Sequence, residues 1–419
     1  MAKLDDLKHL YDTRAGEIDS WLDHQRQQTP PFVTTSVDLR HSGVRLVPVD
    51  VNLFPAGFNN LSPAAVQRAI QNFKKYLSKY YPNTKKIAVI AESHTRNIPY
   101  LINLQMLQEI LMQAGYTAQL GSLIAGWGEP LELDTDGDDR ITLYAMESSG
   151  GRLQLDGGFV PELVLMNHDM TAGVPPVLQN IAQPVIPPPE LGWHRRRKSV
   201  HFSAYGKMAE SFGSAFSIDP WLISAGFHAC GMVDFKQREG LECLAESVEE
   251  LLACARKKYK HYGIDQEPYV YIKADSGTYG MGVMTVNSAR DVLEMNKKER
   301  NKMHVIKEGT QVHEVIIQEG IPTIDRVDGK PAEPMIYLVG GCPTGGMFRV
   351  NGARDPLNNL NAKGMEFTGM CDQNELMPDM EQVKNCHFRS FGLIASLSAL
   401  AAAREDYDNK LEIPGCKEA

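Results

Sequence analysis

The segment YIKADSGTYGMGVMTV, in the second half of the chain, contains residue types that could hold phosphate. Lys273 and Asp275 come first, followed by three glycines: Gly277, Gly280 and Gly282. Glycines let backbone N–H groups approach phosphate oxygens and tolerate positive φ. A lysine beside them supplies a point charge for the same oxygens. The pattern indicates a loop that covers phosphate, and a flexible surface hairpin is the alternative.

The order of the glycines decides which kind of phosphate loop this could be. A Walker loop carries its lysine after the glycines, and a dinucleotide-binding turn has G-x-G-x-x-G at the start of a helix. Here the lysine comes first and the order is G-x-x-G-x-G. The flanking YVYIKA and VMTV are strand patterns rich in β-branched residues. The segment is therefore predicted to be a β-hairpin lid, which argues against a dehydrogenase.

A second group of candidate residues follows on predicted strands. EVIIQEGI is an apolar strand whose end carries Gln318, Glu319 and Ile321. GGMFRVNGARDPLNNLNAKG then brings Arg349 and Arg354 together with several asparagines and glycines. Two arginines and amide side chains just after a strand suit an anionic ligand and a metal ion.

Carboxylates near the N-terminus are the candidates for a metal site. Asp38 lies on one predicted strand and Asp50 and Asn52 on the next. Residues two apart on a strand point to one face, and Mg²⁺ prefers such hard oxygen ligands. Asp275, two residues past Lys273, is a further candidate. For all of these, the alternative is a polar residue that caps a turn at a strand end.

The predicted elements divide the chain into regions of different character. Helices are predicted at 3–28, 62–81, 98–115, 203–217 and 243–262. Two strands are predicted within 30–57, then strands at 86–92, 116–121 and 161–169, and later at 269–275, 282–287, 314–319, 334–341 and 345–351. The middle group, with its strand–helix–strand unit, predicts a parallel sheet. The later strands, joined by short loops, predict an antiparallel sheet with helices between them.

Composition excludes several classes of protein. The chain has 419 residues, more than one core usually organises, and its net charge of −9 makes nucleic acid an unfavourable main partner. Seven cysteines include no C-x-x-C pair, so neither a disulfide framework nor a structural zinc site is expected. Neither a secretory signal nor a bilayer-spanning run is recognisable. We expect a reduced, soluble, cytoplasmic protein without a membrane partner.

Over residues 203–364 the chain resembles the ATP-grasp ligases, glutathione synthetase among them. The similar segments are AYGKMAESF, YIKADSGTYGMGV, IIQEGI and RDPLNNLNAKG. The resemblance implies an α/β (α+β) ATP-grasp fold that binds ATP through Lys207, Lys273, Gly277, Gly280, Gly282, Gln318, Glu319 and Ile321. It implies that the charges acting on the transferred phosphate are Lys273, Arg349 and Arg354.

The family's metal-binding strand has no counterpart after residue 364. The strands with Asp38, Asp50 and Asn52 resemble it instead, as in the circularly permuted eukaryotic glutathione synthetases, with Mg²⁺ as the implied ion. We therefore expect an N-terminal helix and metal-binding strands in 1–60 that complete the ATP-grasp domain. A Rossmann-like subdomain should span 61–190, and the nucleotide-binding region with its lid and C-terminal helix 191–419.

The whole chain is similar to a narrower family, the bacterial glutamate–cysteine ligases of the ATP-grasp type. The segments that carry this similarity are VDVNLFPAGFNNL, MNHDMTAG, GWHRRRKSVHF and FRVNGARDPLNNLNAKG. The similarity implies that ATP, L-glutamate and L-cysteine give γ-glutamylcysteine through a γ-glutamyl phosphate, as the first step of glutathione biosynthesis. Another amino-acid ligase such as glutathione synthetase is the nearest alternative. A nucleotide-binding protein without turnover is a more distant one, and homo-oligomerisation is left open.

Residues for the two amino acids are less clearly marked. Arg40 could pair with a carboxylate, and Arg96 and Asn59 follow strands at positions where ligands dock. Turn capping and surface charge are the alternatives for each. The basic run His194–Lys198 could touch a ligand, although such a run is more often a solvated face.

Overall fold

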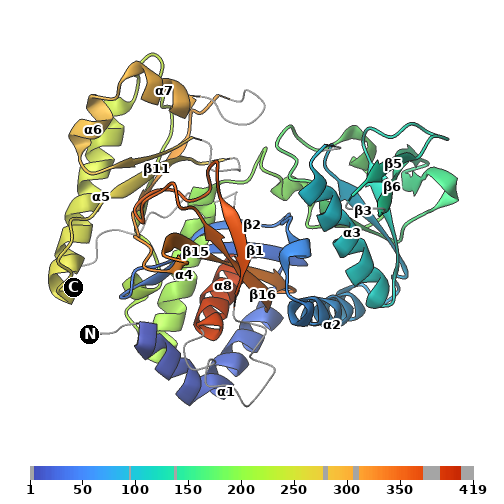
Figure 1. Cartoon of the computed structure of the whole chain (residues 1–419), viewed down its shortest axis with the longest axis horizontal. Helices are drawn as coiled ribbons and strands as arrows, with labels where there is room; N and C mark the ends of the chain where they lie inside the picture. Colours follow the sequence, from blue (N-terminus) through green and yellow to red (C-terminus); the bar gives the residue numbers. More distant parts are fainter. Residues whose placement is uncertain are drawn as a thin grey trace.

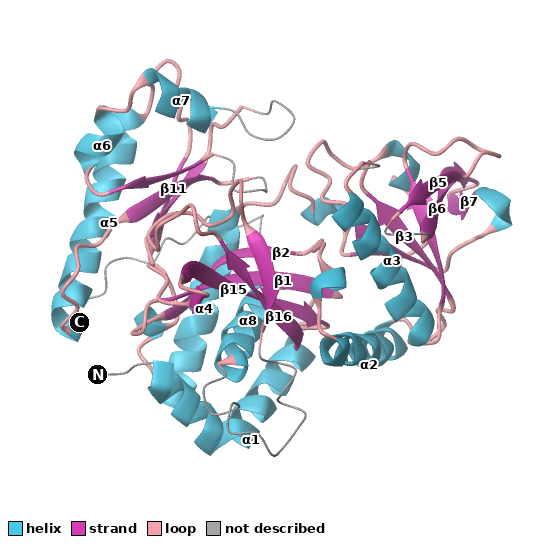
Figure 2. Ribbon diagram, viewed as in Figure 1, coloured by secondary structure: helices cyan, strands magenta, loops and turns pink. Residues whose placement is uncertain are grey.

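The computed structural model describes residues 4–93, 96–135, 139–276, 282–304, 311–370 and 387–406. Three separate sheets form its frame (Figures 1 and 2). A central sheet lies in the middle of the molecule, a mostly parallel sheet lies at the right of the view, and a smaller sheet with its own helices lies at the upper left. The short 3₁₀ helices are η1 Phe58–Asn60, η2 Asp156–Gly158, η3 Pro176–Leu178, η4 Pro189–Leu191 and η5 Pro220–Leu222.

The central sheet joins the two ends of the chain. Its strand order is β17-β16-β15-β1-β2, with β14 paired to β15, and its pairs are antiparallel. The strands are β1 Thr34–His41, β2 Leu46–Asn52, β14 Arg326–Val327, β15 Lys330–Val339, β16 Cys342–Val350 and β17 Glu366–Gly369. Because β1 pairs directly with β15, strands from the two ends of the chain form one sheet.

Both faces of β15, in the middle of the central sheet, are buried. Alternate residues of β15 belong to two different cores: Met335 and Tyr337 to one, Ile336 and Leu338 to the other, as a side-chain period of two requires. Helix α2 (Pro63–Tyr80) packs against β15 and β16, and α8 (Phe388–Ala402) packs on β1, β2, β15 and β16. Helices α1 (Leu4–Gln28) and α4 (Lys198–Phe216) contact α8 in turn. Enclosure by this sheet and these helices explains why α8 is apolar almost all round.

The mostly parallel sheet has the order β5-β6-β4-β3-β8-β9, with β7 on β6. Its elements are β3 Lys86–Ala91, α3 Ile98–Gln113, β4 Thr117–Ser122, β5 Leu131–Asp134, β6 Arg140–Ser149, β7 Arg152–Leu155, β8 Leu163–Asn167 and β9 Val185–Ile186. The pairs of β3 with β4 and β8 are parallel, so the predicted strand–helix–strand unit is confirmed. The strands β5, β6 and β7 were not predicted. The domain limits at residues 60 and 190 stay a prediction.

The third sheet, which we call the lid sheet, has the order β10-β13-β11-β12. Its elements are β10 Phe227–Cys230, α5 Leu241–Tyr262, β11 Val270–Ala274, β12 Val283–Val286, α6 Ala289–Leu293, α7 Lys297–His304 and β13 Val315–Glu319. Antiparallel pairing of β11 with β12 confirms the predicted hairpin. The expectation of one antiparallel sheet after residue 269 is wrong, because these strands are divided between the lid sheet and the central sheet.

Two expectations from composition can be compared with the structure. No helix within the described residues is long and apolar enough to cross a membrane. Cys230, Cys243 and Cys342 are free thiols. Cys254 on α5 is disulfide-bonded, which differs from the expectation that the chain is reduced.

A buried ion pair fixes the start of α4 against the end of α8. Arg196 Nη2 lies 2.6 Å from Glu405 Oε1, both side chains are 1% exposed, and Arg196 also donates to the carbonyl of Val51. His201 Nδ1 lies 2.9 Å from the same carboxylate. Burial acts to raise the pKa of Glu405, but Arg196 and His201 outweigh it and lower this pKa to about 2.

We therefore expect Glu405→Gln to lower the free energy of unfolding at pH 7 by about 3 kcal/mol, since it leaves the Arg196 charge buried without its partner. Urea unfolding measures this. Because the folded-state pKa is depressed, the wild-type advantage should be complete above pH 4.5 and shrink as the pH falls toward 2. Glu249→Gln, in a half-exposed pair with Arg256, is the control and should change stability by less than about 1 kcal/mol. Equal losses in the two variants would contradict the expectation.

Candidate active site

A buried network of four charges lies on three adjacent strands of the central sheet. Glu333 on β15 accepts from Arg40 Nε on β1 at 2.7 Å and from Arg349 Nη1 on β16 at 2.5 Å. The same Arg349 nitrogen lies 2.7 Å from Asp38 Oδ2. The register places Glu333 directly opposite Arg349, and Asp38 and Arg40 share one face of β1 because they are two residues apart. The pleat of the sheet thus brings all four side chains together.

The pairing decides how these carboxylates titrate. Burial acts to raise the pKa of Glu333, but the two guanidinium groups outweigh it and this pKa lies below its ordinary value. Asp38 behaves in the opposite way. Burial raises its pKa, Arg349 offsets only part of this, and the nearby charges of Glu333 and Asp50 raise it further. Asp38 is therefore a buried carboxylate beside two others, with Arg349 as its ion-pair partner.

Glu333 was not predicted from the sequence. It is a single carboxylate on β15, between apolar neighbours, in a strand that is buried after its first residue. A charge at such a position needs a buried partner of opposite sign, and that requirement was the signal available in the sequence. The partner could not be named without the strand order, because Arg40 and Arg349 lie on different strands.

Lys273 on β11 and Lys198 at the start of α4 face the edge of β2. Lys273 Nζ donates to the carbonyl of Val49 at 3.1 Å and to Gln318 Oε1 at 2.7 Å. Lys198 Nζ lies 2.6 Å from Asp50 Oδ1. Enclosure acts to raise the pKa of Asp50, but the ammonium groups of Lys198 and Lys273 lower it below its ordinary value. Lys273 of the lid sheet and Lys198 of α4 therefore both present positive charge to Asp50 of the central sheet.

These side chains line one narrow cavity of about 60 Å³ between the central sheet, the lid sheet and α4. Its polar lining residues are Asp38, Arg40, Asp50, Lys198, Tyr271, Lys273, Glu333, Arg349, Asn359 and Asn361. The structure thus brings the predicted Asp38, Arg40, Asp50, Lys273 and Arg349 together from both ends of the chain. The tertiary structure adds four further residues to this cavity: Lys198, Glu333, Asn359 and Asn361. The two asparagines belong to the NLNAKG segment, which the sequence had singled out.

Other predicted residues lie outside this cavity. Both carboxylate oxygens of Asp275 accept hydrogen bonds from Ser199, one from its N–H and one from its hydroxyl, so Asp275 caps the first turn of α4. Asn52 Oδ1 accepts from the N–H of Phe54 at 3.0 Å. These are the turn-capping roles that the sequence left as alternatives. Lys207 and Arg354 are exposed, the first on α4 and the second after β16.

The residues predicted to contact the nucleotide lie at the end of β13. Gln318 holds Lys273, and Ile321 packs with Val47 and Ala225 in a small core. Glu319 makes a buried ion pair with Arg45, with Nη1–Oε1 at 2.6 Å and Nη2–Oε2 at 2.9 Å. Its side chain is therefore engaged, and its N–H donates to the carbonyl of Gly226. The contact of this segment with a nucleotide stays a prediction.

The remaining predicted residues fall at three places. Gly282 has a φ of +60°, and its carbonyl accepts from the N–H of Ala274, whereas Gly277 and Gly280 lie outside the described residues. Asn59, on η1, has a buried Oδ1 without a hydrogen-bond partner among the described residues. Arg96 is exposed just before α3.

The carboxyl end of the parallel sheet carries another polar cluster. Within the described residues, Glu92, His168 and Asp169 place possible cation ligands within 4.8 Å of one another. Glu92 Oε1 accepts from the N–H of Asp169, and His168 Nδ1 accepts from the N–H of Met170. The cluster thus also shapes the loop after β8.

Two antiparallel sheets that face each other across a cavity, with a lysine on a glycine-rich hairpin and carboxylates on the opposite sheet, define an enzyme of the ATP-grasp type. The family comparison then identifies the narrower group. The model of the GshA glutamate–cysteine ligase family matches residues 8–406, and the chain belongs to that family. The chain is accordingly a ligase, with glutamate–cysteine ligase function.

A solved structure supports this assignment. It is that of a protein from Methylobacillus flagellatus KT provisionally named gamma-glutamylcysteine synthetase. The two sequences are 41% identical, the match covers 96% of this chain and 95% of the other, and the TM-score is 0.87. No curated protein matches the chain.

More distant structures are also similar. A glutathione synthetase-like effector from Globodera pallida is 10% identical, with a TM-score of 0.36 over 87% of this chain and 80% of that one. A D-alanyl-alanine synthetase A from Vibrio cholerae O1 is 10% identical, with a TM-score of 0.28 over 60% of this chain and 67% of that one. At these TM-scores the likeness carries no inference about this chain.

The charge of Lys273 should be sensitive to pH near neutrality. Burial lowers its pKa, Asp50 offsets part of this, and the cations Lys198 and Arg40 lower it again, to about 8. We expect the ammonium to lose its proton near pH 8 in the chain without added metal. NMR of the chain with ¹³C-labelled lysine measures this, and Lys273→Arg identifies the signal by its loss. A signal that titrates near the ordinary value of about 10.4 would contradict the expectation.

Proposed function

We propose that the chain uses ATP and Mg²⁺ to join L-glutamate to L-cysteine. The γ-carboxylate of glutamate attacks the γ-phosphorus of ATP, ADP leaves, and the cysteine amine then displaces phosphate from the γ-glutamyl phosphate to give γ-glutamylcysteine. This reaction would be the first step of glutathione biosynthesis. The observation that carries the proposal is the cavity in which Asp38 and Asp50 of the N-terminal strands meet Lys273 of the hairpin.

The residues present fit a divalent cation. Asp38 and Asp50 are opposite each other in the register of β1 and β2, and both line the cavity. Their carboxylates are the hard oxygen donors that Mg²⁺ prefers. Burial, together with the neighbouring carboxylates of Glu333 and Asp50, raises the pKa of Asp38, and a bound cation would favour its charged form. Asp38 and Asp50 would hold the ion, and Asn52 would join them once its Oδ1 leaves the N–H of Phe54. The bound ion would neutralise phosphate oxygens during transfer.

The other cavity residues have electrostatic roles in this proposal. Lys273 and Arg349 supply positive charge to the phosphates, and Arg354 would join them from the segment after β16. Gln318 orients Lys273 through a hydrogen bond of 2.7 Å. A volume of about 60 Å³ is far below the roughly 300 Å³ of a small ligand site. We therefore expect the lid sheet to move away from the central sheet before a nucleotide enters.

The substrate pair is tested by ADP release with defined amino acids. Continuous ADP release should need glutamate and cysteine together with ATP and Mg²⁺, because the γ-glutamyl phosphate is consumed only when the cysteine amine displaces its phosphate. A coupled assay of the wild-type chain measures this. Glutamate alone and cysteine alone are the controls. Release with γ-glutamylcysteine and glycine instead would favour the glutathione synthetase alternative.

The permuted metal site is tested by Asp50→Ala combined with Asn52→Ala. ADP formation should fall by at least about 100-fold, more than the loss of an outer partner of a metal site usually costs. The Mg²⁺ concentration for half-maximal rate should rise in parallel, since a ligand to the ion is gone. Asp134→Ala, at an exposed pair on β5, is the control and should keep both values. Retention of wild-type Mg²⁺ dependence by the double variant would show that the ion binds elsewhere.

A further inference from the structure

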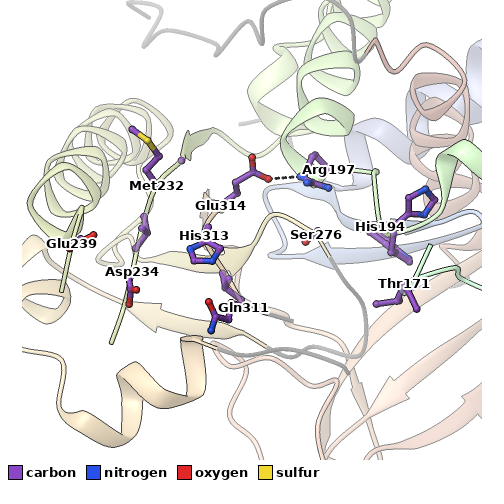
Figure 3. Close-up of a pocket in the computed structure, with 15 residues that line it drawn as sticks. Thr171, His194, Arg197, Met232, Asp234, Glu239, Ser276, Gln311, His313 and Glu314 are labelled. Atoms are coloured by element: carbon purple, nitrogen blue, oxygen red, sulfur yellow. Dashed lines mark hydrogen bonds and ion pairs between the residues drawn. The ribbon is translucent and has the colours of Figure 1, made fainter. Parts of the chain in front are cut away.

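A second and much larger cavity lies beside the narrow one. It has a volume of about 960 Å³ and opens between the loop after β8, the start of α4 and the lid sheet (Figure 3). Ser276, which directly follows Asp275 before the glycine hairpin, lines it, and so does Arg197. Lys198, the next residue, lines the narrow cavity. The two cavities therefore meet at the first turn of α4.

Arg197 is held in a defined position at the wall of this cavity. Its Nε donates to Glu314 Oε2 at 2.6 Å, as Figure 3 shows, and its Nη1 donates to the carbonyls of Arg195 and Arg196. Its Nη2 has no hydrogen-bond partner among the described residues, and 29% of the side chain is exposed. An arginine fixed along two edges, with donors to spare, matches a carboxylate ligand in geometry and charge.

Glu314 is a weakly held partner for Arg197. Its side chain is 53% exposed, and exposed ion pairs contribute only about 0–1 kcal/mol. It lies directly before β13 of the lid sheet, whereas Arg197 follows Arg196, which is anchored in the core by Glu405. The pair therefore connects Glu314, which would move with the lid sheet in the proposed movement, to Arg197, which would stay in place. A ligand carboxylate can take the place of Glu314 at little cost.

His194 complements Arg197 in the same cavity. Its Nδ1 lies 3.0 Å from the carbonyl oxygen of Met170, so in the neutral ring Nδ1 carries the proton and donates it. Nε2 is then an acceptor. A guanidinium donor and an imidazole acceptor that line the same cavity suit the carboxylate and the ammonium group of an α-amino acid.

We infer that Arg197 anchors the α-carboxylate of an amino-acid substrate in this cavity, and that Glu314 occupies Arg197 until the substrate arrives. The inference rests on the ligase function and adds the residues that receive a substrate. Both glutamate and cysteine carry an α-carboxylate, so the experiment below measures KM for each amino acid separately.

The two partners of the pair should change substrate affinity in opposite directions. Arg197→Gln removes the anchor and should raise KM for one amino acid by about 10- to 100-fold, the effect of losing a charge-assisted hydrogen bond. Glu314→Gln removes the competitor and should lower the same KM by about two- to fivefold. KM for ATP should stay unchanged in both variants. Steady-state kinetics with glutamate and cysteine varied separately show which amino acid responds.

Arg256→Gln and Glu249→Gln, from the half-exposed pair on α5, are the matched controls and should leave every KM unchanged. If Arg197→Gln and Glu314→Gln both raise KM, the pair is only a structural bridge and the inference is wrong. It is equally wrong if neither amino-acid KM responds to Arg197→Gln. If the wild type does not release ADP with glutamate and cysteine, the proposed function is wrong, but the inference about Arg197 is not yet tested. Calorimetric titration of the wild type and Arg197→Gln with each amino acid then decides the inference separately.

Discussion

The buried carboxylate of Glu333, held between Arg40 and Arg349, is the constraint on which the rest of the site depends. Burying these charges is costly, and the cost is offset only when the partners meet in good geometry. That geometry exists only if β1, β15 and β16 are neighbours in the observed register, since a shift by one residue would turn each side chain to the opposite face. The network therefore ties the N-terminal strands to the C-terminal half.

A second buried pair connects the central sheet to the lid sheet. Arg45, in the turn between β1 and β2, binds both oxygens of Glu319 at the end of β13 and lies 3.8 Å from the Trp221 ring centroid. It also donates to the carbonyls of Trp221 and Ser224. Such a saturated contact fixes one end of β13 relative to the central sheet. The lid-sheet movement proposed above would then be a rotation about this end.

Neighbouring residues of the basic run before α4 have different roles in the structure. Arg196 is buried against Glu405, Arg197 reaches Glu314 across the larger cavity, and Lys198 holds Asp50 in the narrow one. A continuous basic surface, the usual interpretation of such a run, does not form. The chain turns into α4 at this point, so successive side chains leave in different directions. The segment thereby links the core, the lid sheet and the proposed metal site.

Local patterns in the sequence determined the hairpin at Lys273, the strand–helix–strand unit and the pairing of the two N-terminal strands. Each of these features depends on residues close in the chain, so the spacing of apolar residues and the turn-forming residues between them predict it. The sequence also marked Asp38, Asp50 and Arg349 as carriers of charge on strands. Only the tertiary structure decided which charges face each other. Glu333, Lys198 and the larger cavity depend on strand order and on the packing of α4, and contacts between residues so far apart in the chain leave no local pattern.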